Sequence, residues 1–342
     1  MISCIQCGKN PAAVSLVLCG DCLRKYPRTE KLIDLHANLR KKLCLTPKPP
    51  RSSGGLRCNV CVNECVMGEG EVGYCGLRRN EGGHLVERAG EGKAIAHMYL
   101  DAIPTNCCAA WFCNGSKESG YNLAFFFYGC SFDCLYCQNM EHKMFERASI
   151  IMEDELVSRA MDKRVRCVCF FGGSPEPQIL FALHSAERII LESKGSKHIC
   201  WEWNGSGRTD LVKRAAELSM ESGGTVKFDL KAFDSKLHHA LCGVGNKRTL
   251  QNFKLLAGMF PEGDVITATT LLVPYYVDKK EVGAIASFIA SINPRIPYSL
   301  LVFHPDFYLD DLPITPRDQV LQCYDEACKY LERVFIGNRQ LL

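Results

Sequence analysis

The segment GCSFDCLYCQN, residues 129–139, places three cysteines close together. Cys130, Cys134 and Cys137 follow the spacing C-x3-C-x2-C. A closed tetrahedral zinc site needs four protein ligands, so three thiols from one loop are one ligand short. Three thiolates can instead hold three irons of a [4Fe–4S] cluster and leave the fourth iron open. The sequence therefore predicts a cluster whose missing ligand is not a protein side chain.

The composition indicates a globular protein of a reducing compartment. The chain has 342 residues, 47% of them apolar, and can bury a sizeable core. Its 21 cysteines occur in a long chain, and the N-terminal residues MISCIQCGKN form no apolar signal segment. We therefore expect a cytoplasmic protein whose clustered cysteines hold metals rather than disulfides. No apolar run approaches the roughly 20 residues that span a bilayer, so no membrane partner is expected.

The first 24 residues predict a zinc ribbon. Two C-x2-C knuckles stand eleven residues apart, and Gly8 and Gly20 allow the chain to turn there. Zinc is the metal we expect, although a rubredoxin-like iron site would use the same thiolates. The four predicted ligands are Cys4, Cys7, Cys19 and Cys22.

Residues 25–57 are rich in lysine and arginine and end in TPKPPRSSGG, which is typical of a linker. The stretch LIDLHANLRKKL could form a short basic helix, and beside a zinc ribbon it would fit a nucleic-acid contact. No aromatic residues are interleaved with the charges to stack on bases. We therefore expect a solvated, charged linker and treat nucleic acid as the weaker alternative.

Residues 58–119 form a second cysteine-rich segment. Cys58, Cys61, Cys65 and Cys75 predict a metal site, and their spacing fits a second zinc as well as an auxiliary iron–sulfur cluster. The run IPTNCCAAWFCNG adds a further group, which could supply ligands or could consist of buried small residues. Its cysteines are Cys107, Cys108 and Cys113.

Residues 120–342 alternate short apolar runs with amphipathic stretches. Such alternation requires parallel strands joined by helices, and six units predict an α/β fold, a partial (β/α)6 barrel. In such barrels chemistry gathers at the C-terminal ends of the strands, where the loop at 129–139 lies. Helices are expected near 152–162, 177–193 and 209–220. The predicted strands are 123–129, 166–173, 198–203, 226–233, 265–273 and 298–303.

The pattern C-x3-C-x-aromatic-C, with Tyr136 as the aromatic residue, resembles the signature of radical S-adenosylmethionine (SAM) enzymes. The resemblance implies that SAM chelates the open iron and that an electron from the reduced cluster breaks the sulfur–C5′ bond of SAM. The product would be a 5′-deoxyadenosyl radical that abstracts hydrogen from a substrate. It also implies a reductant such as ferredoxin or flavodoxin and, because an exposed cluster is oxygen-sensitive, an anaerobic source.

From about Leu56 to the end, the chain is similar to proteins related to pyruvate formate-lyase activating enzyme, including the radical SAM member of the AmmeMemoRadiSam system. The matching motifs include YGCSFDCLYCQN, FFGGSPEPQ, FDLKAFD, LLVPYYVD and LLVFHPD. Ser174 departs from the family, which usually has an acidic residue there. The resemblance makes Glu202 and Asp229 candidates for a monovalent cation site. The implied cofactor-binding residues are Tyr136, Gly172, Gly173, Ser174, Glu176, Glu202, Asn204, Asp229, Lys231, Val273 and His304.

The resemblance favours a protein substrate, because activating enzymes abstract hydrogen from a backbone glycine. Modification of RNA or a small metabolite is one alternative, and a non-catalytic zinc-ribbon or iron–sulfur binding protein is another. The remaining cysteines are expected to be packing residues. They are Cys167, Cys169, Cys200, Cys242, Cys323 and Cys328.

Overall fold

A nine-stranded sheet forms the centre of the molecule in this computed structural model, which describes residues 1–25, 29–107, 109–261 and 264–342. The strand order is β15-β14-β13-β12-β11-β10-β8-β7-β9. Strand β8 and strands β10 to β15 run parallel, and at one edge β7 pairs antiparallel with both β8 and β9. Within the described ranges no pairing joins β15 to β9, so the sheet is not a closed barrel. The strands are β7 (Lys93–Ala102), β8 (Tyr121–Phe127), β9 (Ser149–Met152), β10 (Val165–Gly172), β11 (His198–Trp203), β12 (Val226–Asp229), β13 (Ile266–Leu272), β14 (Tyr298–Val302) and β15 (Val334–Gly337).

The α/β class and all six predicted strands are confirmed, and the sheet is larger than expected. Strand β15 adds a further parallel strand after the last predicted unit. Strand β7 lies inside the segment 58–119, where the sequence predicted only metal-binding chain. Because β7 pairs with β8 along its length, the sheet begins at Lys93 rather than near residue 120.

The alternation of side chains along the central strands gives the sheet two different faces. One face carries large apolar residues that are fully buried, such as Phe170 on β10 and Trp201 on β11, whose rings stack at 4.7 Å. Residues of the opposite face line two cavities, and Cys169 and Glu202 are among them. The apolar face packs into the core, and the other face lines the cavities in which polar and thiol side chains could bind a ligand.

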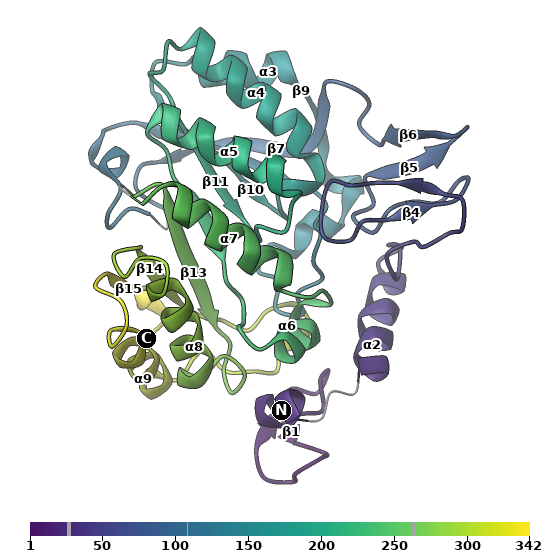
Figure 1. Cartoon of the computed structure of the whole chain (residues 1–342), viewed down its shortest axis with the longest axis vertical. Helices are drawn as coiled ribbons and strands as arrows, with labels where there is room; N and C mark the ends of the chain where they lie inside the picture. Colours follow the sequence, from purple (N-terminus) through teal and green to yellow (C-terminus); the bar gives the residue numbers. More distant parts are fainter. Residues whose placement is uncertain (26–28, 108, 262–263) are drawn as a thin grey trace.

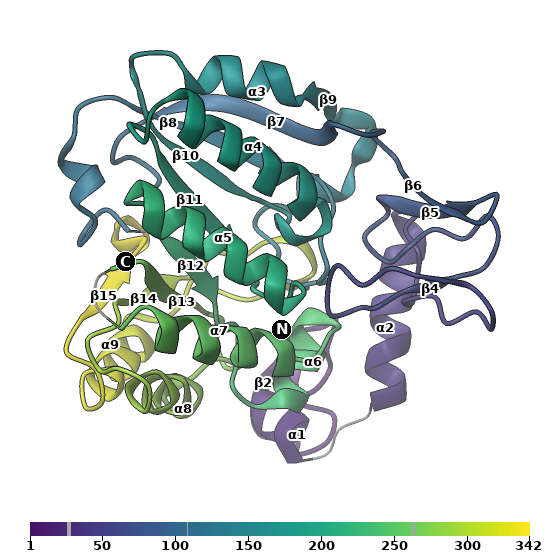
Figure 2. The ribbon, with the colours of Figure 1, turned by 45° about the horizontal axis from the view of Figure 1, so that its top comes forward.

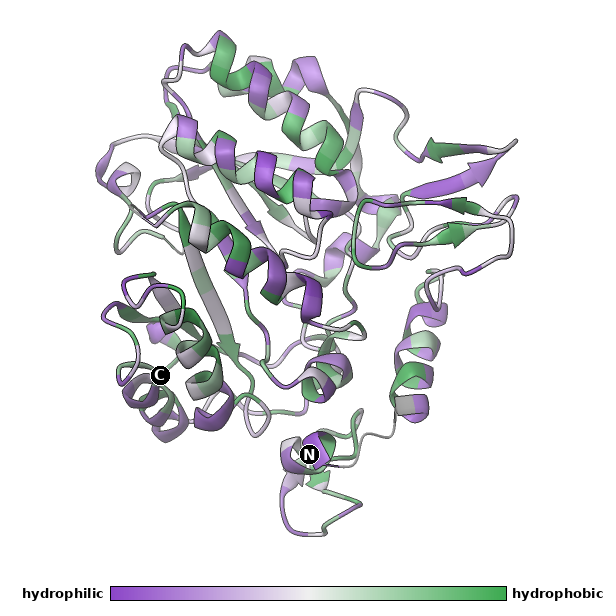
Figure 3. Ribbon diagram, in the orientation of Figure 1, coloured by the Kyte–Doolittle hydropathy of each residue, from purple (hydrophilic) through white to green (hydrophobic). Residues whose placement is uncertain are grey.

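Helices cover the apolar face (Figures 1 and 2). Phe181 of α4 stacks on Phe125 of β8, and Phe253 of α7 contacts Phe228 of β12 edge-on. Figure 3 shows these helices as mixed green and purple ribbons, as expected for helices with one buried and one exposed side. The helices are α1 (Gly20–Lys25), α2 (Thr29–Lys42), α3 (Glu153–Ala160), α4 (Ile179–Glu192), α5 (Thr209–Ser222), α6 (Ser235–Cys242), α7 (Lys247–Met259), α8 (Lys279–Ala290) and α9 (Arg317–Ala327).

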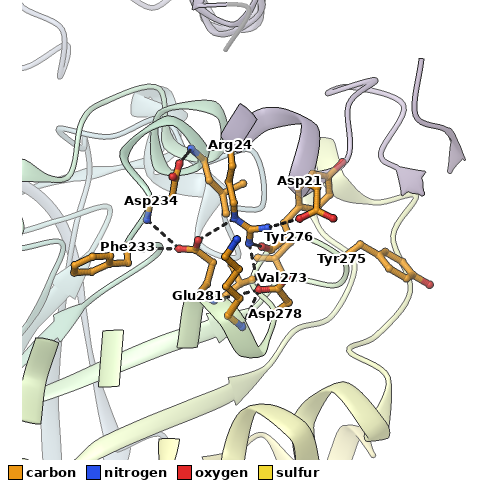
Figure 4. A network of polar contacts seen from close by, with 12 residues as sticks. Asp21, Arg24, Phe233, Asp234, Val273, Tyr275, Tyr276, Asp278 and Glu281 are labelled. Atoms are coloured by element: carbon orange, nitrogen blue, oxygen red, sulfur yellow. Dashed lines mark hydrogen bonds and ion pairs between the residues drawn. The ribbon is translucent and has the colours of Figure 1, made fainter. Parts of the chain in front are cut away.

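The N-terminal region folds back onto the sheet domain. Figure 4 shows Arg24 of α1 among the residues that connect β13 to α8. Its guanidinium donates to Glu281 Oε1 at 3.0 Å, to the Tyr276 carbonyl at 3.0 Å and to Asp278 Oδ1 at 3.2 Å. Three small hairpins complete the region. In the described ranges, no helix of the protein is long and apolar enough to cross a membrane. The hairpin strands are β1 (Ile2–Ser3), β2 (Pro11–Ala12), β3 (Leu56–Arg57), β4 (Val66–Met67), β5 (Arg78–Glu81) and β6 (His84–Glu87).

Candidate functional site

The three-cysteine loop follows the C-terminal end of β8. The amide of Phe132 donates to Cys130 Sγ at 3.3 Å, and Asn204 Nδ2 approaches the same sulfur at 3.7 Å. Amide groups directed at sulfur are typical partners of metal-bound thiolates. Burial raises the pKa of Cys137 to about 11, although Lys143 opposes the shift. These thiols therefore stay protonated at neutral pH until a metal displaces the protons.

Two glycines allow β10 to end close against this loop. Gly129 has φ +81°, and a Cβ there would lie 2.6 Å from Leu77 Cδ1. A Cβ at Gly173 would lie 2.2 Å from the carbonyl oxygen of Gly129. Only glycine fits at such distances, so the sequence GG at 172–173 brings bare backbone next to the cysteines.

A cavity opens between the loop and the inner face of the sheet. Side chains from β10, β11, β12, β13 and β14 line it together with the loop. The structure thus gathers most of the predicted site residues around one cavity. Those in its wall are Cys130, Cys134, Tyr136, Cys137, Gly172, Gly173, Glu202, Asn204, Asp229 and Lys231.

Four predicted cofactor-binding residues do not line this cavity. Ser174 and Glu176 are buried behind it, where Ser174 Oγ donates to Glu176 and the amide of Ser206 donates to Glu176 Oε1 at 3.0 Å. Strand β13 ends at Leu272 and β14 at Val302, so Val273 and His304 come after the strands. The strand positions in the cavity wall are Thr269, Leu271 and Leu301.

Acidic and basic side chains alternate across the cavity wall. Lys227 Nζ lies 2.9 Å from Glu202 Oε2 and 3.4 Å from Asp229 Oδ1, and Lys231 Nζ lies 3.1 Å from Asp229 Oδ2. Burial would raise the pKa of Asp229, but Lys227 and Lys231 together lower it. The resemblance made Glu202 and Asp229 candidates for a monovalent cation site. In the structure the ammonium group of Lys227 bridges these two carboxylates.

Asp133, inside the cysteine loop, is held by three cationic or titratable side chains. Lys143 Nζ lies 2.6 Å from Asp133 Oδ1, His36 Nδ1 lies 2.9 Å from Oδ2, and Arg40 Nη1 lies 3.3 Å from Oδ1. Burial would raise the pKa of Asp133, but Lys143, His36 and Arg40 hold it well below its usual range. The loop is therefore anchored by a buried carboxylate that two cations and His36 hold in place.

His36 and Arg40 belong to α2, in the segment predicted to be a solvated linker. Both side chains are buried, with 3% and 2% of their surfaces exposed. The basic helix was predicted, but the solvated linker is wrong over α2, because part of its charge faces Asp133 rather than water. Residues 26–28 of the predicted linker lie outside the described residues.

The sequence analysis also missed His142 and Cys242 as site residues. His142 lines the cavity, is buried, and its Nδ1 atom has no hydrogen-bond partner in the structure. Cys242 was expected to be a packing residue, but its sulfur lies 3.7 Å from Tyr136 Oη. Neither residue lies in a motif, because both depend on contacts between distant segments.

The observed donor set fits an iron–sulfur cluster that binds a further ligand. Three thiols face one cavity, and His142 offers an unused nitrogen. The contact with Cys242 and burial raise the pKa of Cys134, whereas Lys231 and Lys143 oppose this rise. Positive charge near the thiols favours an anionic thiolate cluster. A single-ion site would need the three sulfurs closer together, as in the N-terminal group described next.

The N-terminal cysteines form a compact group that could hold one metal ion. The sulfurs of Cys4, Cys7, Cys19 and Cys22 all lie within 4.8 Å of one another. Four sulfurs around one zinc ion lie about 3.8 Å apart, because each Zn–S bond measures about 2.3 Å. The four thiols therefore suit a single ion, and a cluster, which binds each thiolate to a separate iron, would hold them farther apart.

The second cysteine group lies directly beside the three-cysteine loop. Cys58, Cys61, Cys65 and Cys75 interact electrostatically with one another, and burial raises the pKa of Cys65 to about 11. The amide of Tyr74 donates to Cys65 Sγ at 3.3 Å. Within the described ranges only the N-terminal group has its sulfurs within 4.8 Å, so this second group is wider.

Comparisons with known proteins agree with this site. Residues 125–289 match the family model described as the Radical SAM superfamily. The chain is 26% identical over 290 residues to an uncharacterized protein of Methanocaldococcus jannaschii, and the aligned region covers 83% of this chain and 81% of that protein. It is 35% identical over 135 residues to isethionate sulfite-lyase activating enzyme of Desulfovibrio desulfuricans, which covers 39% of this chain and 40% of that enzyme.

Among solved structures, the chain is similar to a domain of pyruvate-formate lyase-activating enzyme from Bacteroides vulgatus. The TM-score is 0.42 and the sequence identity 23%, over 50% of this chain and 98% of that one.

Proposed function

Residues 125–289 of this chain form a radical SAM domain, and from this premise we propose that the protein generates a 5′-deoxyadenosyl radical and abstracts hydrogen from a protein substrate. The observation that carries the proposal is the cavity in which Cys130, Cys134 and Cys137 meet the glycine backbone of β10 and the charged ends of β11 and β12. A [4Fe–4S] cluster with bound SAM would supply reductive cleavage of the sulfur–C5′ bond there.

The residues of the cavity wall would bind and orient the cofactors. Cys130, Cys134 and Cys137 would hold three irons, and the open position would face the cavity. The bare backbone at Gly172 and Gly173 leaves room for close approach of a polar group. Lys231 and Asp229 provide a cation and an anion for the charged ends of SAM.

Apolar side chains of the same wall would exclude water from the radical. Phe171, Leu271 and Leu301 line the cavity at the ends of three strands. The Tyr136 ring lies in the wall with Lys231 Nζ 5.9 Å from its centroid, which suits stacking against an adenine. A dry enclosure prevents side reactions of a reactive intermediate.

A protein substrate is the reading that the relatives favour. The match to isethionate sulfite-lyase activating enzyme spans only 40% of that enzyme. That this chain acts on a similar kind of substrate is therefore part of our proposal. The electron donor would be a reductant such as ferredoxin or flavodoxin. A nucleic-acid contact by the basic helix is less favoured, because its Arg40 is buried against Asp133 and does not face solvent.

The test is anaerobic reconstitution with iron and sulfide, reduction, addition of SAM, and assay of 5′-deoxyadenosine by mass spectrometry. We expect 5′-deoxyadenosine from the wild type and background levels from Cys134→Ala. Cys323→Ala, a buried cysteine of α9, is the matched control and should match the wild type. Equal product from Cys134→Ala and Cys323→Ala would contradict the proposed role of the loop.

A further inference from the structure

A second cavity on the inner face of the sheet contains five cysteines. Strand β10 contributes Cys167 and Cys169, β11 contributes Cys200, and the connection between β7 and β8 contributes Cys107 and Cys113. Phe171, Glu202 and Lys227 line both this cavity and the one beside the three-cysteine loop. The thiols thus lie next to the proposed SAM site. Cys108 of the same connection is outside the described residues.

The strand register brings three of these thiols together. Cys169 is the direct cross-strand partner of Cys200, and Cys167 points to the same face two residues earlier. The Cys167 thiol interacts electrostatically with that of Cys200. Cys107 and Cys113 also interact electrostatically with Cys200, which makes Cys200 the centre of the group.

The sequence predicted that Cys167, Cys169 and Cys200 were packing residues, but the core does not need them. The apolar core lies on the other face of the same strands, where Val168, Phe170 and Trp201 are fully buried. Five thiols around one cavity form a ligand set that selects soft metals and iron–sulfur clusters. Within the described part of the chain, no three of these sulfurs are as close as those of the N-terminal group, so the arrangement suits several irons rather than one ion.

We infer that this inner cavity binds an iron–sulfur cluster distinct from the one held by the loop at 130–137. Cys167, Cys169 and Cys200 would be ligands from the sheet, and Cys107 or Cys113 would complete the set. The inference concerns binding alone, so it goes beyond the proposed function and does not depend on which substrate loses hydrogen.

The first experiment counts iron and sulfide in chains that lack the loop ligands. A background chain with Cys130, Cys134 and Cys137 changed to alanine is reconstituted anaerobically, desalted and analysed. Adding Cys167→Ala, Cys169→Ala and Cys200→Ala should remove about two to four irons per chain, the content of one cluster. Adding Cys323→Ala instead should remove none. Equal iron content in the two substituted chains would overturn the inference, and so would a loss of zinc instead of iron on changing the three inner cysteines.

A second measurement needs no substitution and therefore decides the question even if the multiple variant fails to fold. Wild-type protein is alkylated with iodoacetamide before and after reconstitution, and each cysteine is quantified by mass spectrometry. We expect reconstitution to slow labelling of Cys113, Cys167 and Cys200, as it does for the loop cysteines, whereas exposed Cys328 should be unchanged. Unchanged labelling of the three inner cysteines, with the loop cysteines protected, would overturn the inference.

Discussion

At the scale of single residues, Asp133 links the cysteine loop to Lys143 and to two distant side chains of helix α2. It is 2% exposed, has ion pairs with Lys143 and Arg40, and lies 2.9 Å from His36 Nδ1. We predict that Asp133→Asn lowers the free energy of unfolding by about 3–5 kcal/mol, because the cations would stay buried without their anion. Urea unfolding of the metal-free proteins measures the loss. Exposed Asp325→Asn is the control, and an equal effect of both changes would contradict the anchoring role of Asp133.

Glu176 gives a second prediction at the residue scale, which concerns pH. Burial raises the pKa of Glu176 to about 6 from its ordinary 4.5, although Ser174 and the backbone amides of Ser206 and Gly205 lower it. The folded protein then binds this proton more tightly than the unfolded chain does, so stability falls as pH rises from about 4.5 to about 6.

Comparison with Glu176→Gln isolates this effect. The difference in the free energy of unfolding, wild type minus Glu176→Gln, should fall by about 2 kcal/mol between pH 4 and pH 7 and stay constant above. Urea unfolding across that range provides the measurement. A difference that stays constant throughout would show that the Glu176 carboxyl titrates at its ordinary pKa.

At the scale of elements, helix α2 joins three parts of the molecule through one side chain. Arg40 reaches Asp133 in the cysteine loop, the Tyr74 carbonyl beside Cys75, and the Thr46 carbonyl at 2.7 Å. Its guanidinium also lies 3.6 Å from the centroid of the Tyr74 ring. The helix therefore supports the loop and the second cysteine group together.

Replacing Arg40 tests this support. Arg40→Ala should lower the free energy of unfolding by about 3–5 kcal/mol and speed amide exchange in residues 130–137, because Asp133 loses a buried cation and two carbonyls lose a donor. Lys41→Ala, the exposed neighbour on the same helix, should change stability by less than about 0.5 kcal/mol. Equal exchange rates in the two variants would show that α2 does not hold the loop.

The elements that the sequence predicted well are those with local patterns. The six parallel strands and the helices α3, α4 and α5 follow from runs of apolar residues and their spacing. Contacts between distant segments have no such pattern, so the burial of α2 against Asp133 and the gathering of Cys107 with Cys200 were not foreseen. Strand β7 was missed because its alternating residues stand inside a segment interpreted only for its cysteines.

At the scale of the whole molecule, the cysteine groups differ in the distances between their sulfurs. A compact group favours a single metal ion, and a wider group favours a cluster. The N-terminal sulfurs are within 4.8 Å of one another, a separation that suits one zinc ion. The second cysteine group and the loop cysteines are wider, which favours iron–sulfur clusters. The N-terminal region is also attached to the sheet domain by its own contacts, chiefly those of Arg24 and the hydrogen bond of Tyr276 Oη to the Leu18 carbonyl.

Zinc should therefore be separable from iron within one chain. We predict that Cys4→Ser with Cys22→Ser removes about one zinc per chain and leaves the iron content unchanged, because each zinc needs all four thiolates of this compact group. Elemental analysis of anaerobically purified, reconstituted protein measures both metals. Cys58→Ser with Cys75→Ser is the matched comparison and should lower iron while zinc stays constant. Loss of iron on changing Cys4 and Cys22, with zinc retained, would show instead that the N-terminal group holds iron.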